Sequence, residues 1–150
     1  MWQIVVDLSR VTIIATMSFY RSTDQFYICA QALFSQILQD DPQAAASLQK
    51  SRLSIRIRCV QPIGEIFIDG TRMPVQTYFG QSPANPILDI TMPADTLHQI
   101  LLGQLTLTKA LGSGKLQVKG PILKATVLAD LFRYSQTIYP NILRTQGLLT

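Results

Sequence analysis

The stretch from Arg52 to Val60 alternates apolar and polar residues, and this period of two constrains the fold more than any other feature. Leu53, Ile55, Ile57 and Cys59 share one face, and the arginines share the other. This is the pattern of a half-buried strand with a basic outer face. Such a strand needs a sheet around it and a layer that covers its apolar side.

Similar patterns predict the remaining elements. Further strands are expected over 65–69, 75–80, 87–92 and 114–119, and helices over 25–39, 42–50, 93–102 and 122–138. Residues 104–112 are expected to form a helical turn and loop, and Tyr139-Pro140 to end or kink the last helix. Residues 2–20 are ambiguous: helical spacing of apolar positions favours an amphipathic helix, while many Val, Ile and Thr leave a strand open.

This order predicts an α+β fold, in which a five-stranded, mostly antiparallel sheet is covered by helices on one face. We expect a single domain over 1–150, with 1–22 as an extra N-terminal segment and 139–150 as a C-terminal tail.

The apolar content exceeds what a plain core of this size needs. Hydrophobic residues make up 47% of the chain and charged residues 15%, against roughly 25% charged in typical soluble domains. A dense core, a homodimer interface or a ligand cavity with apolar walls would each explain the excess. The net charge of +4 is scattered, which argues against nucleic-acid binding and leaves transient contact with an anionic membrane surface open.

The sequence offers little for catalysis. The single histidine, His98, is interpreted as a surface residue of the 93–102 helix, and no G-x-S-x-G or Gly-rich phosphate loop occurs. Cys29 and Cys59 have no metal-ligand spacing and are expected to be reduced, buried thiols of a cytoplasmic protein. We therefore expect neither an enzyme nor a cofactor or metal, although a small enzyme pairing His98 with a cysteine stays an alternative.

The arginine stripe, Arg52, Arg56 and Arg58, is interpreted as a solvated sheet face. The functional alternative is a site for an anionic headgroup, a membrane surface or an acidic partner.

An ordered set of positions between Leu88 and Phe132 carries a family resemblance. The strand Leu88–Met92 runs into a helix with Asp95 and Leu97, and later positions follow at fixed spacing: Gly103, Leu105, Ala110, Ser113 to Gly120, Ala125, Leu128, Leu131 and Phe132. This set resembles the lipid-binding domain of the sterol carrier protein 2 family. The family often has Asn-Pro where this chain has Thr106-Leu107.

The resemblance implies an apolar tunnel between sheet and helices that holds a fatty acyl, sterol-like or isoprenoid lipid. The implied function is non-catalytic binding or carriage; the alternative is an accessory or dimerisation module of a lipid- or quinone-biosynthesis enzyme assembly. The side chains expected to contact the ligand are Phe26, Phe34, Ile57, Phe67, Phe79, Ile90, Leu97, Leu101, Leu116, Val118, Leu128 and Phe132. The expected partners are thus an apolar small molecule and, in addition, a membrane surface or an enzyme.

Overall fold

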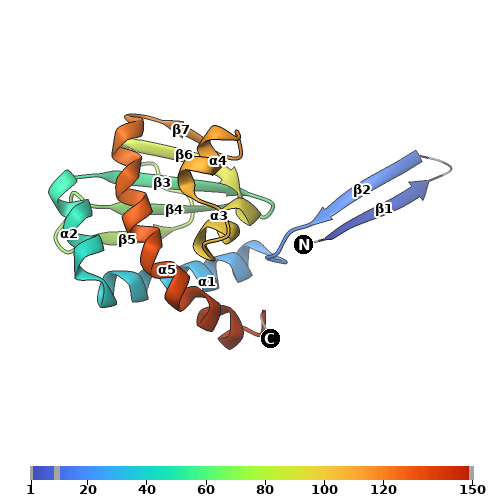
Figure 1. Cartoon of the computed structure of the whole chain (residues 1–150), viewed down its shortest axis with the longest axis horizontal. Helices are drawn as coiled ribbons and strands as arrows, with labels where there is room; N and C mark the ends of the chain where they lie inside the picture. The colour runs from blue at the N-terminus through green and yellow to red at the C-terminus, as the bar shows by residue number, and fades with distance from the viewer. Residues whose placement is uncertain (1, 9–10, 149–150) are drawn as a thin grey trace.

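The computed structural model describes residues 2–8 and 11–148 and has the expected α+β architecture (Figure 1). Its main sheet has five strands in the order β5-β4-β3-β6-β7. The strands are β3 (Ser54–Val60), β4 (Gly64–Asp69), β5 (Gln76–Phe79), β6 (Leu88–Pro93) and β7 (Gln117–Lys119). The alternation from Leu53 to Cys59 is confirmed, since its four apolar side chains are fully buried.

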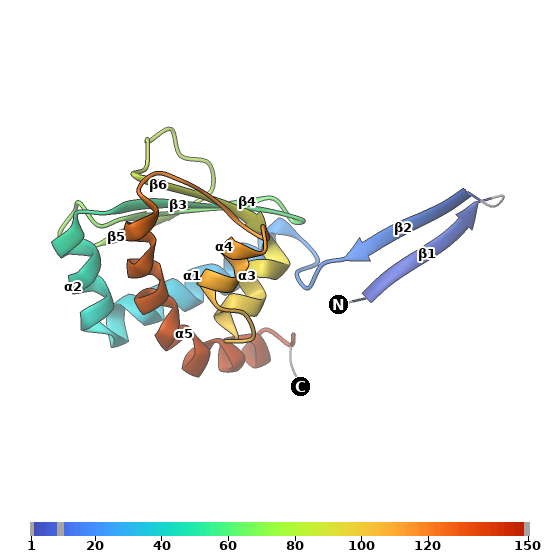
Figure 2. The same cartoon turned by 45° about the horizontal axis from the view of Figure 1, so that its top comes forward.

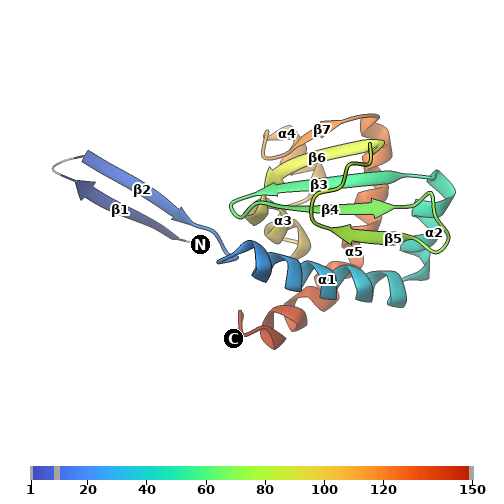
Figure 3. The ribbon, with the colours of Figure 1, turned by 180° about the vertical axis from the view of Figure 1, so that it is seen from behind.

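The sheet is mixed, because one of its four strand pairs is parallel. The pairs β3–β4, β4–β5 and β6–β7 are antiparallel, whereas β6 runs parallel to β3. Strand β6 therefore does not follow β5 but crosses to the other side of β3. The connecting loop passes over the outer face of the sheet, as Figure 3 shows. Arg56 holds this loop by donating hydrogen bonds to the carbonyls of Ser82 and Ala84, each at 3.4 Å.

Helices cover the opposite face of the sheet, so the molecule has two layers (Figure 2). The helices are α1 (Thr23–Asp40), α2 (Pro42–Ser51), α3 (Ala94–Leu101), α4 (Leu107–Gly112), the 3-10 turn η1 (Ile122–Ala125) and α5 (Thr126–Thr145). Ser22 caps α1, where its hydroxyl accepts a hydrogen bond from the Gln25 amide. Pro42 occupies the first turn of α2, where its missing N–H costs no hydrogen bond.

Helix α5 continues through Pro140 to Thr145. The prediction that the helix ends at Tyr139-Pro140 is therefore wrong. Buried Ile142 and Leu143 lie beyond the proline, with 8% and 0% of their surface exposed. Their burial outweighs the hydrogen bond that proline cannot donate. Residues up to Thr145 are therefore helical rather than part of a loose tail, while 149–150 lie outside the described residues.

The helix favoured for residues 2–20 is wrong. Two antiparallel strands, β1 (Trp2–Leu8) and β2 (Val11–Met17), stand there instead, with Trp2 opposite Met17 and Leu8 opposite Val11. Ile, Val and Thr make up eight of the fourteen residues of the two strands, and β-branched residues favour extended backbone over helix. Figure 1 shows this hairpin apart from the five-stranded sheet, and Figure 3 shows the same from behind.

Candidate ligand pocket

An apolar pocket opens at the β7 edge of the sheet, between β6, β7, α4, η1 and the start of α5. Its volume is about 230 Å³. Among the described residues that line it, two threonine hydroxyls are the only side-chain polar groups. The lining residues are Ile90, Leu107, Thr108, Leu111, Leu116, Val118, Ile122, Leu123, Ala125, Thr126 and Ala129.

Local sequence explains why this edge is not filled. Strand β7 has three residues and ends at Lys119, and the next residue, Gly120, has a φ of 118° that suits glycine alone. The 3-10 turn η1 follows, and α5 begins only at Thr126. Ile122 and Leu123 therefore do not fold into the core: 52% and 87% of their surface is exposed, at the rim of the pocket.

The twelve side chains expected to contact a ligand are distributed over three places. Ile90, Leu116 and Val118 line the pocket. Eight pack in or against the closed core: Phe26, Phe34, Ile57, Phe79, Leu97, Leu101, Leu128 and Phe132. Phe67 is buried on the other face of the sheet, beside Tyr78 and opposite Arg56 in the register. A continuous tunnel between sheet and helices stays a prediction.

Sequence reasoning missed most of the wall. The sequence predicts a helical turn, loop and helix for the segments that became α4 and η1, and it assigns no role at a site to their lining side chains, Leu107, Leu111, Ile122 and Leu123. A usable signal existed, because these apolar residues directly flank the glycine-bracketed segment 114–120 that carries the family resemblance.

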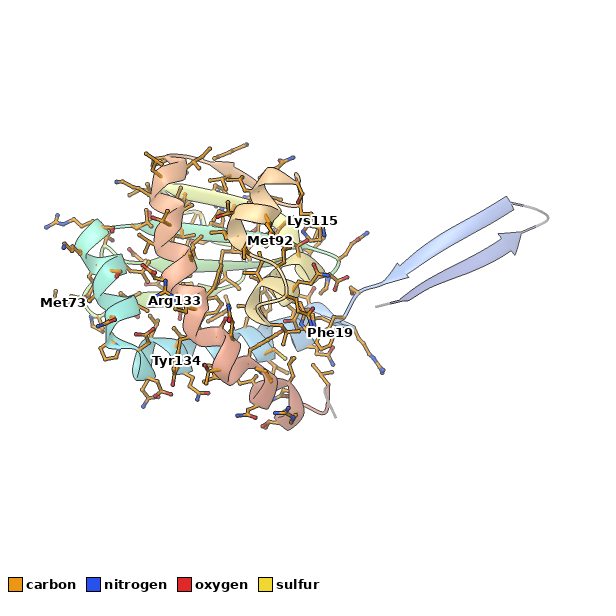
Figure 4. The ribbon with its side chains drawn as sticks, viewed as in Figure 1. Phe19, Met73, Met92, Lys115, Arg133 and Tyr134 are labelled. Carbon is orange, nitrogen blue, oxygen red and sulfur yellow. The ribbon has the colours of Figure 1, made fainter. Side chains whose placement is uncertain are left out.

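A second groove of about 190 Å³ adjoins the pocket and shares Leu107 and Ala129 with it. Its remaining wall includes Ile100, Leu105 and Phe132. The side chains of Leu107 and Ala129 therefore separate the pocket from the groove. A larger groove of about 360 Å³ between α2 and α5, at Arg133 and Tyr134 in Figure 4, is lined mainly by polar residues and does not suit an apolar ligand.

The predicted arginine stripe is only partly confirmed, because Arg52 is the exposed C-cap of α2 and lies outside β3, whereas Arg56 and Arg58 lie on the strand. Arg56 makes two hydrogen bonds to Asp89, from Nε at 3.3 Å and from Nη2 at 2.8 Å. The hydrogen-bonded guanidinium lowers the pKa of Asp89 below its usual value. Arg58 lies 3.8 Å from Glu65. Arg56 thus anchors the β5–β6 loop rather than facing solvent freely.

His98 is half-buried in an aromatic cluster with Phe19 and the buried Tyr20 and Tyr139, which differs from the surface position expected for it. Its ring stacks on Phe19 with centroids 3.7 Å apart, and its Nδ1 lies 2.7 Å from the Tyr139 hydroxyl. Tyr139 in turn is hydrogen-bonded to Tyr20. Figure 4 shows Phe19 where the N-terminal segment meets the helical layer. The cluster ties that segment to α3 and α5.

The cysteines do not form a nucleophilic site with His98. Burial raises the pKa of Cys29 to about 11 and of Cys59 to about 12, so both remain thiols near neutral pH. Among residues 18–148, the hydrogen-bond partner of His98 is a tyrosine hydroxyl and neither sulfur is bonded to its ring. The arrangement has the character of a packed core rather than of a thiolate–imidazole pair.

The burial of His98 predicts a pH-dependent stability. Desolvation lowers its pKa to about 4, against about 6.5 in the unfolded chain. As the pH falls, His98 of the unfolded chain takes up a proton before His98 of the folded protein does. The contribution of neutral His98 to the free energy of unfolding is therefore complete above about pH 6.5 and is lost towards pH 4. Allowing for partial exposure, we expect a loss of roughly 2 kcal/mol. Urea unfolding at pH 7.5 and 4.5 measures it.

The control for this prediction is His98→Phe, which preserves the stacking surface but cannot take up a proton. Its free energy of unfolding should change less between the two pH values than that of the wild-type protein. Equal pH dependence in both proteins would show that other groups carry the effect.

Comparison with known families decides the classification. The profile of the SCP-2 sterol transfer family matches residues 34–133, two thirds of the chain. The chain belongs to this family. The match includes the β7 edge and all eleven residues of the pocket wall. The resemblance found in the sequence is thereby confirmed, and the family's members bind lipids or other apolar ligands and are generally non-catalytic.

Solved structures of the SCP-2 family share the fold. Sterol carrier protein 2 from Yarrowia lipolytica, in its apo form, has a TM-score of 0.57 at 21% identity and covers 70% of this chain and 88% of its own. The sterol carrier protein domain 2 of Helicoverpa armigera scores 0.55 at 19%, covering 74% and 86%. A ubiquinone synthesis protein, UbiJ-SCP2, scores 0.54 at 19%, covering 72% and 88%. No curated protein sequence matches the chain.

Two absences concern residues 2–8 and 11–148, the part of the chain that the structure describes. No helix there is both long and apolar enough to cross a bilayer. No group of three or more His, Cys, Asp or Glu side chains there is placed to hold a metal ion.

Proposed function

We propose that the chain binds a long apolar molecule, a fatty acyl, sterol-like or isoprenoid lipid, and that the pocket at the β7 edge receives it without catalysing a reaction. The observation that carries the proposal is the wall itself, which presents nine aliphatic side chains and two threonines to the opening. Such a surface selects a ligand by its shape and apolar character rather than by a particular polar group. Membership of a sterol transfer family supports the same class of ligand.

The size of the pocket sets how a ligand would bind. Its volume of about 230 Å³ is below the roughly 300–1,000 Å³ of common ligand pockets, so it would hold part of a long molecule. Leu107 and Ala129 separate it from the groove towards Phe132. A shift of the half-buried Leu107 would join the two spaces and admit a longer chain. Each methylene transferred from water contributes about 0.8 kcal/mol.

Lipid binding is tested on the intact protein by two measurements. Native mass spectrometry of freshly purified protein is expected to show a fraction carrying an apolar adduct. After delipidation, a fluorescent long-chain fatty acid should bind saturably, at one molecule per chain, and unlabelled fatty acid should displace it. Protein that is always bare and shows no saturable binding would overturn the proposal.

A further inference from the structure

The N-terminal hairpin has one face that is apolar from end to end. Residues directly opposite each other in an antiparallel pair lie on the same face, and successive residues of a strand alternate between faces. The register of β1 and β2 therefore places eight apolar residues on one face, in the pairs Trp2–Met17, Ile4–Ala15, Val6–Ile13 and Leu8–Val11. The pairs on the other face are mostly polar: Gln3–Thr16, Val5–Ile14 and Asp7–Thr12. The hairpin is thus amphipathic, as is typical of strands with one side against a core.

This hairpin has no packing partner within its own chain, as far as residues 2–8 and 11–148 show. It stands apart from both the sheet and the helical layer in Figures 1, 2 and 3. A two-stranded hairpin is marginally stable at best in water unless its apolar face packs against another element. We therefore expect that the covering element comes from outside this copy of the chain.

The base of the hairpin is fixed to the helical layer. The Phe19 amide donates a hydrogen bond of 2.8 Å to the Asp95 carboxylate, and the Phe19 ring stacks on His98. The next residue, Tyr20, is 1% exposed and is hydrogen-bonded to Tyr139. The hairpin therefore leaves the helical layer at a fixed point, which reduces the conformational entropy that association would cost.

We infer that the hairpin is a dimerisation arm, whose apolar face packs against the same face of the hairpin of a second copy. Packing about a twofold axis brings two identical apolar faces together, as the two sheets of a β-sandwich do. Edge-to-edge pairing would instead leave both apolar faces in water. At roughly 60 Å² for each side chain, eight residues bury about 500 Å² on each copy, so the total reaches the ~1,000 Å² that a specific interface needs.

The charge of the arm favours a second copy over a lipid surface. Asp7 is the one charged residue of the two strands, and its register position is on the polar face. Lysines and arginines beside an apolar surface attract a segment to an anionic bilayer, and the two strands contain neither. Dimerisation does not depend on the proposed function, since the pocket wall comes from residues 90–129.

Sedimentation velocity of the full chain tests the dimer without any substitution. Between about 1 and 100 µM the protein should pass from monomer to dimer, as suits an interface of this size. The chain's single tryptophan, Trp2, is at one end of the apolar face, so its fluorescence should shift to the blue over the same concentrations. A protein that stays monomeric throughout, with unchanged Trp2 emission, would overturn the inference.

Matched double variants locate the interface. Val6→Thr with Ile13→Thr puts hydroxyls on the apolar face and keeps the β-branched side chains that favour strands. Val5→Thr with Ile14→Thr makes the same changes at the neighbouring register position, on the other face. Four unpaired hydroxyls in the contact should weaken association of the first variant at least about 100-fold, whereas the control should stay within about twofold of wild type.

The variants also separate dimerisation from other uses of the hairpin. Equal loss of the dimer in both double variants, or loss in neither, would overturn the inference. A monomeric protein whose Trp2 emission shifts to the blue only with phosphatidylcholine vesicles would assign the apolar face to a lipid surface instead. Neither substituted pair belongs to the pocket wall, so both variants should bind a fluorescent fatty acid like wild type if the proposed function holds.

Discussion

Ala129→Phe is expected to abolish most apolar ligand binding while leaving the fold intact. Ala129 lines both the pocket and the adjoining groove, and its exposed position on α5 gives a larger side chain room to turn into the opening. A phenyl ring there displaces about three methylenes of ligand at about 0.8 kcal/mol each. The affinity for a fluorescent fatty acid should therefore fall roughly 50-fold.

The matched control for this substitution is Ala46→Phe. Ala46 is an exposed alanine of α2 outside both hollows, so it reports the cost of a phenylalanine on a helix surface without blocking either space. It should bind fatty acid like wild type. If Ala129→Phe binds as tightly as Ala46→Phe, the ligand does not occupy the pocket at the β7 edge.

Gly120→Ala is expected to cost about 3 kcal/mol of the free energy of unfolding. Two effects combine at this position. The φ of 118° is strained for any residue with a Cβ, and a Cβ there would collide with the carbonyl oxygen of Ile87. The collision would push β7 away from β6 and open the floor of the pocket. Urea unfolding measures the loss, and fatty-acid affinity should fall with it.

Two other glycines separate the causes. Gly80 has a similar φ of 113° but nothing within 4 Å of an added Cβ, so Gly80→Ala reports backbone strain alone, at about 1–2 kcal/mol. Gly112 has open space and no positive φ, so Gly112→Ala should be near neutral. A Gly120→Ala protein no less stable than Gly80→Ala would contradict close packing of β7 on the β6 edge.

Local patterns were sufficient for much of the sheet and helical layer. The alternation of apolar and polar residues predicted β3. Ser22, Pro42 and Pro93 predicted three helix starts within a few residues of their positions in the structure. These patterns depend on interactions between residues that are close in sequence, so they can be recognised without knowledge of the tertiary fold. Pro140 was misjudged for the opposite reason, because the burial of Ile142 and Leu143 comes from packing that the local sequence does not state.

The wall of the pocket could not be predicted residue by residue. Phe26, Leu97 and Leu128 are as apolar as Leu116 and Val118, yet the first three fill the closed core. The pocket exists because β7 and η1 do not pack fully against α4 and α5. The side chains that line it are therefore set by the positions of these four elements in the tertiary structure. The N-terminal hairpin posed a different problem, since its apolar spacing suits a helix and its β-branched residues suit strands.

The roles of an accessory module and of a homodimer stay predictions. The shared fold with UbiJ-SCP2, at 19% identity, is compatible with the first and does not favour it over lipid binding. The apolar excess that suggested a dimer is accounted for in part by the core and by the exposed pocket rim.

Methyl NMR of the full chain during titration with a long-chain fatty acid tests the location of the ligand most directly. The account predicts shifts and ligand contacts at Leu107, Leu116, Val118 and Ala129, with Ala46 unchanged. Unchanged methyl signals at the pocket, or contacts confined to the outer face of the sheet around Phe67, would contradict it.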